Sequence, residues 1–259
     1  MGQDLAKRMK LMTFMIMKIL FLGGCLLTTK TVDKDKRFVN VLQAENSEVT
    51  VTLARYASFS LVKEVFAAHT SEISDAVVFL IRPFPYYILT KLFPRVPGIN
   101  GGTKIKIHPG LFSDKNRNWF IENDRKIVEM DWNPNGTKRT ATHAINLKLG
   151  QMLGMEEWAI NYVQRIVLDL VSDCRRKNIQ LIVIGPPAVQ NDKHERVLLV
   201  NLNAALARVI PNYVDLFSEE FPDRMLGPDK VHYNDAGHFQ LAKKIEERLF
   251  TFHASKVAQ

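Results

Sequence analysis

The stretch MKILFLGGCLLTT, from Met17 to Thr29, decides how this chain is interpreted. It joins an apolar run to Cys25, one of two cysteines in the protein, and basic residues precede it. It fits three interpretations: a lipoprotein signal ending in an acylated cysteine, a membrane anchor, or a buried strand that carries Cys25 at its end. Lys18 counts against the first two, because a charge is out of place in a signal peptide core or a membrane span.

Further short apolar runs along the chain favour the buried strand. The predicted strands are Lys18–Gly23, Val49–Ala54, Ala76–Ile81, Gln180–Gly185 and Tyr213–Phe217. The predicted helices are Asp35–Asn46, Ser60–Ile73, Glu156–Asn178, His194–Ile210 and Asn234–Phe252. Continuous apolar runs are typical of strands buried on both faces of a parallel sheet, and their alternation with helices predicts a doubly wound α/β domain. Removal of the residues up to Cys25 would take the first strand from this sheet.

The expected organisation is a single domain over residues 17–253. Residues 1–16 form an N-terminal extension, basic and then apolar, and residues 254–259 form a tail. Residues 94–154 are rich in glycine, proline, asparagine and charge, and they are too long for an ordinary connection between strand and helix. We expect an insertion or lid there. The sequence leaves open whether residues 1–16 are part of the mature protein.

Composition excludes several classes of protein. The net charge of +8 is not focused into a long basic run, and no nucleic-acid-binding motif occurs, so we expect no nucleic acid partner. Two cysteines cannot form a disulfide framework, and Cys174 falls on a predicted helix, where we expect a structural role. The sequence favours a cytoplasmic protein. Export or membrane anchoring is the alternative, and we expect membrane association only through the N-terminal segment.

The strongest local signal for chemistry is GPDKVHYNDAGHFQLAKKI, in which His232 follows Asp229 by three positions just before a helix that Asn234 or Asp235 would cap. A carboxylate at this spacing can accept a hydrogen bond from the imidazole Nδ1–H and hold the ring in one tautomer. The other nitrogen is then available as a base toward a nucleophile elsewhere in the chain.

These residues bring the sequence close to a known family. The segment DKVHYNDAGHFQLAKKI resembles the last conserved block of the SGNH, or GDSL-type, hydrolases, and QLIVIGPPAV and YVDLFSEEF resemble the elements that precede it. Upstream, Gly23, Gly24, Cys25 and Leu26 occupy the positions of the family's Gly-Asp-Ser-Leu turn. The resemblance is strong in the last third of the chain and degenerate in the first.

The resemblance implies a three-layer α/β/α sandwich with a flavodoxin-like, mostly parallel five-stranded sheet. It also implies hydrolysis of acyl esters, carried on sugars or lipids, without a metal or organic cofactor. Cys25 would be the nucleophile in place of serine, His232 the base and Asp229 the residue that orients it. A cysteine thiolate beside an imidazole can serve as such a nucleophile.

The remaining family positions depart from the pattern. The second block has no glycine, so the resemblance assigns the oxyanion-binding amide to Ser60. In the third block Phe84 replaces the asparagine, and Arg82 becomes the candidate for binding an oxyanion or substrate, together with Gly24. Two alternatives therefore stay open: an inactive binding or scaffold protein on the same fold, and a lipoprotein anchored through Cys25.

Overall fold

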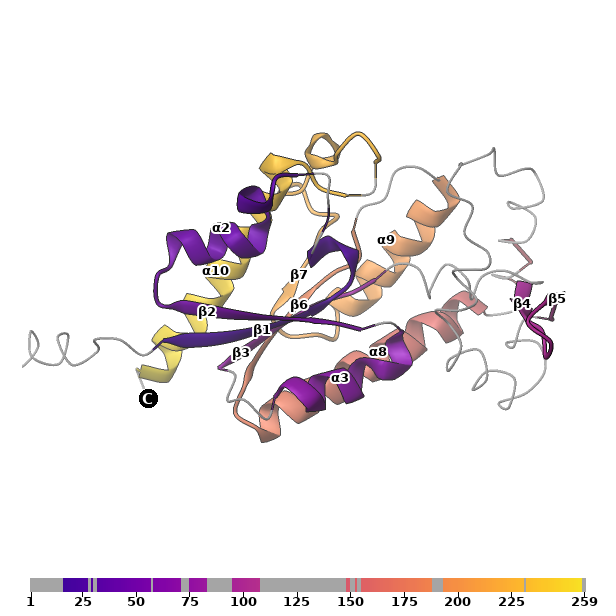
Figure 1. The fold of residues 1–259 in the computed structure, drawn as a ribbon, viewed down its shortest axis with the longest axis horizontal. Helices are drawn as coiled ribbons and strands as arrows, with labels where there is room; N and C mark the ends of the chain where they lie inside the picture. The colour runs from indigo at the N-terminus through magenta and orange to yellow at the C-terminus, as the bar shows by residue number, and fades with distance from the viewer. Residues whose placement is uncertain are drawn as a thin grey trace, which may run out of the picture.

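A computed structural model describes residues 16–27, 29, 32–56, 58–70, 75–82, 95–107, 148–149, 152, 155–187, 193–230 and 232–257. Its centre is a five-stranded sheet in the order β2-β1-β3-β6-β7, in which every neighbouring pair is parallel (Figure 1). The strands are β1 (Met17–Gly23), β2 (Val49–Arg55), β3 (Ala76–Leu80), β6 (Gln180–Ile184) and β7 (Tyr213–Val214). The predicted parallel α/β sheet is therefore confirmed.

The opening stretch forms β1, an interior strand of this sheet. β1 pairs with β2 along its whole length and with β3 from Ile19 to Leu22. The side chains from Ile19 to Leu22 are at most 1% exposed, because both faces of the strand are covered. Cleavage before Cys25 would remove the strand that holds β2 and β3 together.

Helices cover both faces of the sheet, which gives the three layers of the sandwich (Figure 1). α2 (Phe38–Glu45) and α10 (Asp235–Val257) lie on one face. α3 (Val62–His69), α8 (Met155–Arg176) and α9 (Lys193–Ala207) lie on the other. α10 continues to Val257, into the segment expected to be a tail. None of the helices in the described part of the chain is long and apolar enough to cross a membrane.

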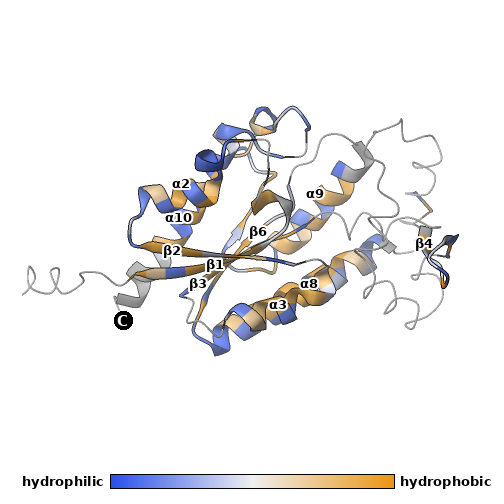
Figure 2. Ribbon diagram, in the orientation of Figure 1, coloured by the Kyte–Doolittle hydropathy of each residue, from blue (hydrophilic) through white to orange (hydrophobic). Residues whose placement is uncertain are grey.

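Each face of the sheet has its own apolar core, and side chains alternate between the two. Leu20 and Leu22 of β1 pack toward α3, α8 and α9, whereas Ile19 and Phe21 pack toward α2 and α10. Figure 2 shows the apolar colouring concentrated on the strands and on the helix surfaces that meet them. The double burial explains why these strands appear in the sequence as continuous apolar runs.

A small antiparallel hairpin lies apart from the main sheet. It consists of β4 (Arg95–Pro97) and β5 (Thr103–Ile105) and falls within the expected insertion. Most of the insertion at 94–154 lies outside the described residues, so its role as a lid remains a prediction. The hairpin is fixed to the body by Val96, which is fully buried in the core that α3, α8 and α9 form.

Candidate active site

The candidate residues of the first three strands meet at the carboxyl edge of the sheet. Gly24 and Cys25 follow β1, Ser60 lies in a short 3-10 helix, η3 (Phe59–Leu61), after β2, and Arg82 comes just after β3. Because β1 lies between β2 and β3, Ser60 and Arg82 come from the strands on either side of the Cys25 turn. Ligands of open parallel sheets bind at this edge.

Asp229 holds His232 through two hydrogen bonds. The imidazole Nδ1 lies 2.7 Å from Asp229 Oδ2, and the backbone N–H of His232 donates to Oδ1 of the same carboxylate at 3.0 Å. The His232 side chain is 22% exposed, so the ring is partly shielded but still reachable from solvent. The carboxylate fixes both the ring and the backbone, which leaves Nε2 as the nitrogen that can exchange a proton with a substrate or nucleophile.

The turn that carries this pair is tightly closed. Leu226 and Tyr233 form an antiparallel bridge on either side of it, and the Gly227 N–H donates to the His232 carbonyl at 2.6 Å. Lys230 at the tip has a φ of 58°, a left-handed conformation that is uncommon for a residue other than glycine. The closed turn keeps Asp229 and His232 facing each other.

Helix α10 begins directly after His232 and anchors the turn. Asn234 is its cap, because its side-chain Oδ1 accepts a hydrogen bond from the Gly237 N–H at 3.1 Å. The Asn234 side-chain amide also donates to the Arg224 carbonyl at 2.8 Å, which ties the helix start to the preceding segment. Of the two caps that the sequence allowed, the structure selects Asn234.

Packing brings this turn toward the segment that follows β1. Leu26 and Leu27, which follow Cys25, belong to the same buried cluster as Tyr233, the neighbour of His232. Further along, Lys36 forms an ion pair with Asp235 at the start of α10, with 2.7 Å between Nζ and Oδ2. Segments far apart in the sequence therefore converge at one end of the sheet.

Cys25 opens a 3-10 helix, η1 (Cys25–Leu27), directly beyond the end of β1. Its side chain lies outside what the structure describes, so its role as nucleophile remains a prediction. Cys174 is a buried residue of α8, and burial, aided by the charge of Asp173, raises the pKa of its thiol to about 12. Cys174 is therefore a structural thiol with little thiolate at neutral pH.

Arg82 lies against Gly24. A Cβ atom at position 24 would come within 2.7 Å of Arg82 Cδ, so only glycine leaves room for this arrangement. The guanidinium Nη1 donates to the Tyr56 carbonyl at 3.0 Å, and the guanidinium carbon lies 5.7 Å from the centre of the Tyr56 ring. The structure thus places the Arg82 guanidinium group beside the turn that carries Cys25. In the family that the sequence resembles, the position of Gly24 in this turn is an aspartate.

Tyr56 also fixes the backbone of this region. Its hydroxyl donates to the Leu80 carbonyl at 2.8 Å and accepts from the Arg82 N–H at 3.0 Å, so it joins the ends of β2 and β3. The side chain is 1% exposed. Tyr56 did not stand out in the sequence, because nothing local shows that a tyrosine after β2 reaches across β1 to β3.

We expect Tyr56→Phe to lower the free energy of unfolding by about 1–3 kcal/mol, because it removes the buried hydroxyl that pairs with the Leu80 carbonyl and the Arg82 N–H. The phenyl ring keeps the packing with Phe59 and Phe79. Urea unfolding of the two proteins measures the difference. An unchanged midpoint and slope would show that water replaces the hydroxyl at this position.

Ser60 lies where the sequence predicts it, in η3 after β2. Its hydroxyl is 2.6 Å from that of Ser58, which is 3% exposed. This contact engages the side chain within the turn. Its assignment as a backbone donor to an oxyanion remains a prediction.

His238, on the first turn of α10, is a second histidine near the site. It is fully buried, its ring stacks on Phe38 with the centroids 5.7 Å apart, and its Nδ1 accepts from the Phe38 N–H at 3.3 Å. Nε2 has no hydrogen-bond partner among the described residues. Burial lowers the pKa of His238 to about 4, so the ring is neutral at pH 7. His238 joins α2 to α10 through these contacts. The sequence did not indicate this structural role, because His238 lies within the motif that was considered for catalysis.

The pH dependence of stability tests this role. An unfolded histidine has a pKa of about 6.5, so between about pH 6.5 and pH 4 the unfolded chain binds a proton that buried His238 does not. The free energy of unfolding should therefore fall through this window as pH falls, by up to about 1.4 kcal/mol per pH unit. His238→Leu should lose this contribution, and urea unfolding at several pH values compares the two slopes. If the free energy of unfolding changes with pH in the same way in both proteins, the proposed contribution of His238 is wrong.

No protein-family model matches this sequence, and no curated protein does either. Solved structures do resemble it. A phospholipase A1 from Streptomyces albidoflavus NA297 is 11% identical, with a TM-score of 0.53 over 90% of this chain and 99% of the other. A catalytic mutant of an acetylxylan esterase from Geobacillus stearothermophilus is also 11% identical, with a TM-score of 0.52 over 90% of this chain and 93% of the other.

At this level of identity the likeness shows the fold. The chain has the α/β fold of the SGNH hydrolases, as the sequence resemblance predicts. The likeness covers most of the length of both neighbours, so the sheet and its helices correspond as a whole.

Proposed function

We propose that this protein hydrolyses acyl esters, or transfers their acyl groups, with Cys25 as nucleophile, His232 as base and Asp229 as the residue that orients the base. The observation that carries the proposal is the 2.7 Å contact between His232 Nδ1 and Asp229 Oδ2, held in a closed turn at the carboxyl edge of the sheet. The solved structures with the same fold include a phospholipase and an acetylxylan esterase. This supports a substrate in which a lipid or a carbohydrate carries the acyl group.

In the first half of the proposed reaction, His232 Nε2 takes the proton of the Cys25 thiol. The thiolate sulfur attacks the ester carbonyl carbon and a tetrahedral oxyanion forms. As this intermediate collapses, the imidazolium gives its proton to the leaving alcohol oxygen, and a thioester on Cys25 remains. Asp229 stabilises the imidazolium while it carries that proton.

In the second half, water attacks the thioester carbonyl carbon while His232 removes one of its protons. Collapse of the second tetrahedral intermediate breaks the carbon–sulfur bond, releases the carboxylic acid and returns the proton to Cys25. An alcohol in place of water would yield a new ester, which is acyl transfer.

Arg82 is the proposed source of oxyanion stabilisation. Its guanidinium is anchored beside Gly24 by the Tyr56 carbonyl, at 3.0 Å from Nη1, so its charge is positioned before any substrate binds. A fixed cation of this kind stabilises the developing oxyanion without reorganisation. The Ser60 and Gly24 amides are the candidate backbone donors in the same role.

Alkylation with iodoacetamide tests the nucleophile directly, because the other cysteine, Cys174, is buried and the pKa of its thiol is raised. We expect fast labelling of the wild-type protein at one site, Cys25, since burial and a pKa of about 12 protect Cys174. His232→Ala should slow this labelling by about tenfold or more, because the thiolate loses its imidazole partner.

Two variants serve as controls. Cys174→Ala should label like the wild type, and Cys25→Ala should neither label quickly nor hydrolyse a short acyl ester. If Cys25→Ala hydrolyses the ester as fast as the wild type, the proposed acyl-enzyme is wrong. If Cys25 labels at the rate of a free thiol with and without His232, the site is inert, which would favour the binding or scaffold alternative.

A further inference from the structure

The β4–β5 hairpin presents an apolar tip to solvent. Its turn is tight, because the Gly98 N–H donates to the Gly102 carbonyl at 2.6 Å and Gly101 has a φ of 76°. Ile99 lies in this turn and is 95% exposed. Since Val96, at the base of the hairpin, is fully buried in the main core, the tip is held on the body of the protein.

Lysine and isoleucine alternate from Lys104 to Ile107, at the end of β5 and in the two residues that follow it. Ile105 is 71% exposed and Ile107 is 46% exposed, and Lys104 and Lys106 stand beside them in the sequence. Partial burial and the charge of Lys104 both lower the pKa of Lys106, so the two ammonium groups repel each other. A surface that combines exposed isoleucine with lysine resembles the interfacial elements that insert apolar side chains among lipids and hold anionic headgroups with cations.

The stretch of sequence that contains the hairpin is basic. No aspartate or glutamate occurs between Asp75 and Asp114, and the basic residues in that interval are Arg82, Lys91, Arg95, Lys104 and Lys106. The interval therefore has a positive charge of its own, within a chain whose overall charge is +8. Its charge complements an anionic surface.

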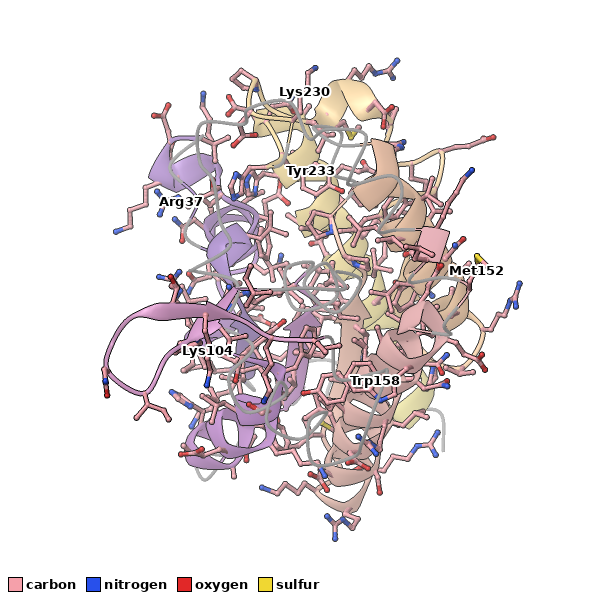
Figure 3. The ribbon with its side chains drawn as sticks, turned by 90° about the vertical axis from the view of Figure 1, so that its right-hand side faces the viewer. Arg37, Lys104, Met152, Trp158, Lys230 and Tyr233 are labelled. Atoms are coloured by element: carbon pink, nitrogen blue, oxygen red, sulfur yellow. The ribbon has the colours of Figure 1, made fainter. Side chains whose placement is uncertain are left out.

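The hairpin and the turn of Asp229 and His232 can be seen from one side of the molecule (Figure 3). Figure 3 looks onto this side, with Lys104 on the hairpin and with Lys230 and Tyr233 marking the turn of Asp229 and His232. Met152, just before α8, is labelled in the same view and is 82% exposed. Exposed apolar side chains are therefore present on this side of the molecule beyond the hairpin itself.

We propose that the hairpin Arg95–Ile107 docks this protein on an anionic lipid bilayer, with Ile99 and Ile105 entering the headgroup region and Lys104 and Lys106 contacting anionic headgroups. The surface is distinct from the N-terminal segment, where the sequence places membrane association. The proposal does not depend on the proposed ester hydrolysis, because binding to a bilayer requires neither Cys25 nor His232.

Co-sedimentation of the full chain with lipid vesicles tests the proposal. The probes are vesicles of phosphatidylcholine alone and of phosphatidylcholine mixed with phosphatidylserine. We expect binding to the mixed vesicles that weakens as salt is added. The double variant I99S/K104E should lower the partition coefficient on these vesicles by about tenfold or more, because it removes an inserting side chain and reverses a charge.

The matched control is R208E/V209S, which makes the same change in charge and removes an apolar side chain that is 45% exposed. These residues lie before β7, at the opposite end of the sheet. All variants keep the same N-terminal sequence, so any binding through residues 1–16 is common to them. His232→Ala should bind vesicles like the wild type, which separates docking from catalysis.

Three outcomes would overturn the proposal. One is equal binding of the wild type and the hairpin variant to the mixed vesicles. Another is equal wild-type binding to neutral and anionic vesicles. The third is a wild-type protein that does not bind vesicles and is a dimer by light scattering, while the hairpin variant is a monomer. That result would show that the hairpin forms a contact between two copies of this chain.

Discussion

Replacing His232 by alanine should lower the turnover of a short acyl ester by about 10⁴-fold or more, in the range found when a member of a catalytic triad is removed. In the proposed mechanism, loss of the imidazole leaves the Cys25 thiol without a base and the leaving alcohol without an acid. Asp229→Asn should have an effect of similar size, because the amide cannot stabilise the imidazolium that forms. Nitrophenyl acetate hydrolysis, followed by absorbance, measures both variants.

Asp235→Asn is the matched control for Asp229→Asn. Both are changes from carboxylate to amide near the start of α10, but Asp235 pairs with Lys36 rather than with His232. It should retain near-wild-type turnover. Circular dichroism confirms that each variant is folded. Turnover of folded His232→Ala within about tenfold of the wild type would contradict the proposed role of His232 as base.

Removal of the Arg82 side chain should lower kcat by about 100- to 1,000-fold, the usual cost of losing one oxyanion donor. Arg82→Lys should not restore the rate, because a single ammonium group cannot reproduce the planar guanidinium that rests on the Tyr56 ring and donates to its carbonyl. Arg165→Ala is the control, since Arg165 also stacks on a tyrosine, Tyr162, but lies on α8. It should leave kcat unchanged.

The contact between Arg82 and Gly24 gives this prediction a second test. Gly24→Ala should displace the arginine, because its Cβ would lie 2.7 Å from Arg82 Cδ, and kcat should fall. In the Arg82→Ala background the same change has room, so it should cost little more. A double-mutant cycle measures this coupling. Strictly additive losses would show that Gly24 acts on the reaction by a route that does not involve Arg82.

Much of the fold could be predicted because its signals are local. β1, β3 and β6 are nearly continuous apolar runs, and burial on both faces of a parallel sheet produces that pattern. β7 was predicted to continue to Phe217 but ends at Val214. There the Asp215 carboxylate accepts from the Phe217 N–H at 2.7 Å, and this local turn competes with further strand pairing.

In the candidate site, only the contact with a local signal could be predicted. Asp229 and His232 could be paired from their spacing, since three positions in a turn bring the side chains together. The packing of Arg82 on Gly24 and the reach of Tyr56 across β1 are tertiary contacts without a local signature. The hairpin was hidden for another reason: its glycines and proline indicated irregular chain, and the buried anchor Val96 is a single residue within it.

The interior position of β1 has a consequence for biosynthesis. As the chain leaves the ribosome, β1 and the Cys25 turn emerge well before His232 and α10. The contacts that close the structure, such as Phe38 with His238 and Asn46 with Glu246, join residues 200 positions apart. Such long-range closure is slow, and nascent chains that lack α10 expose the apolar face that this helix covers. Cys25 and His232, the proposed nucleophile and base, can meet only after the segment that carries His232 has been made, so a nascent chain without that segment carries a cysteine that lacks its proposed base.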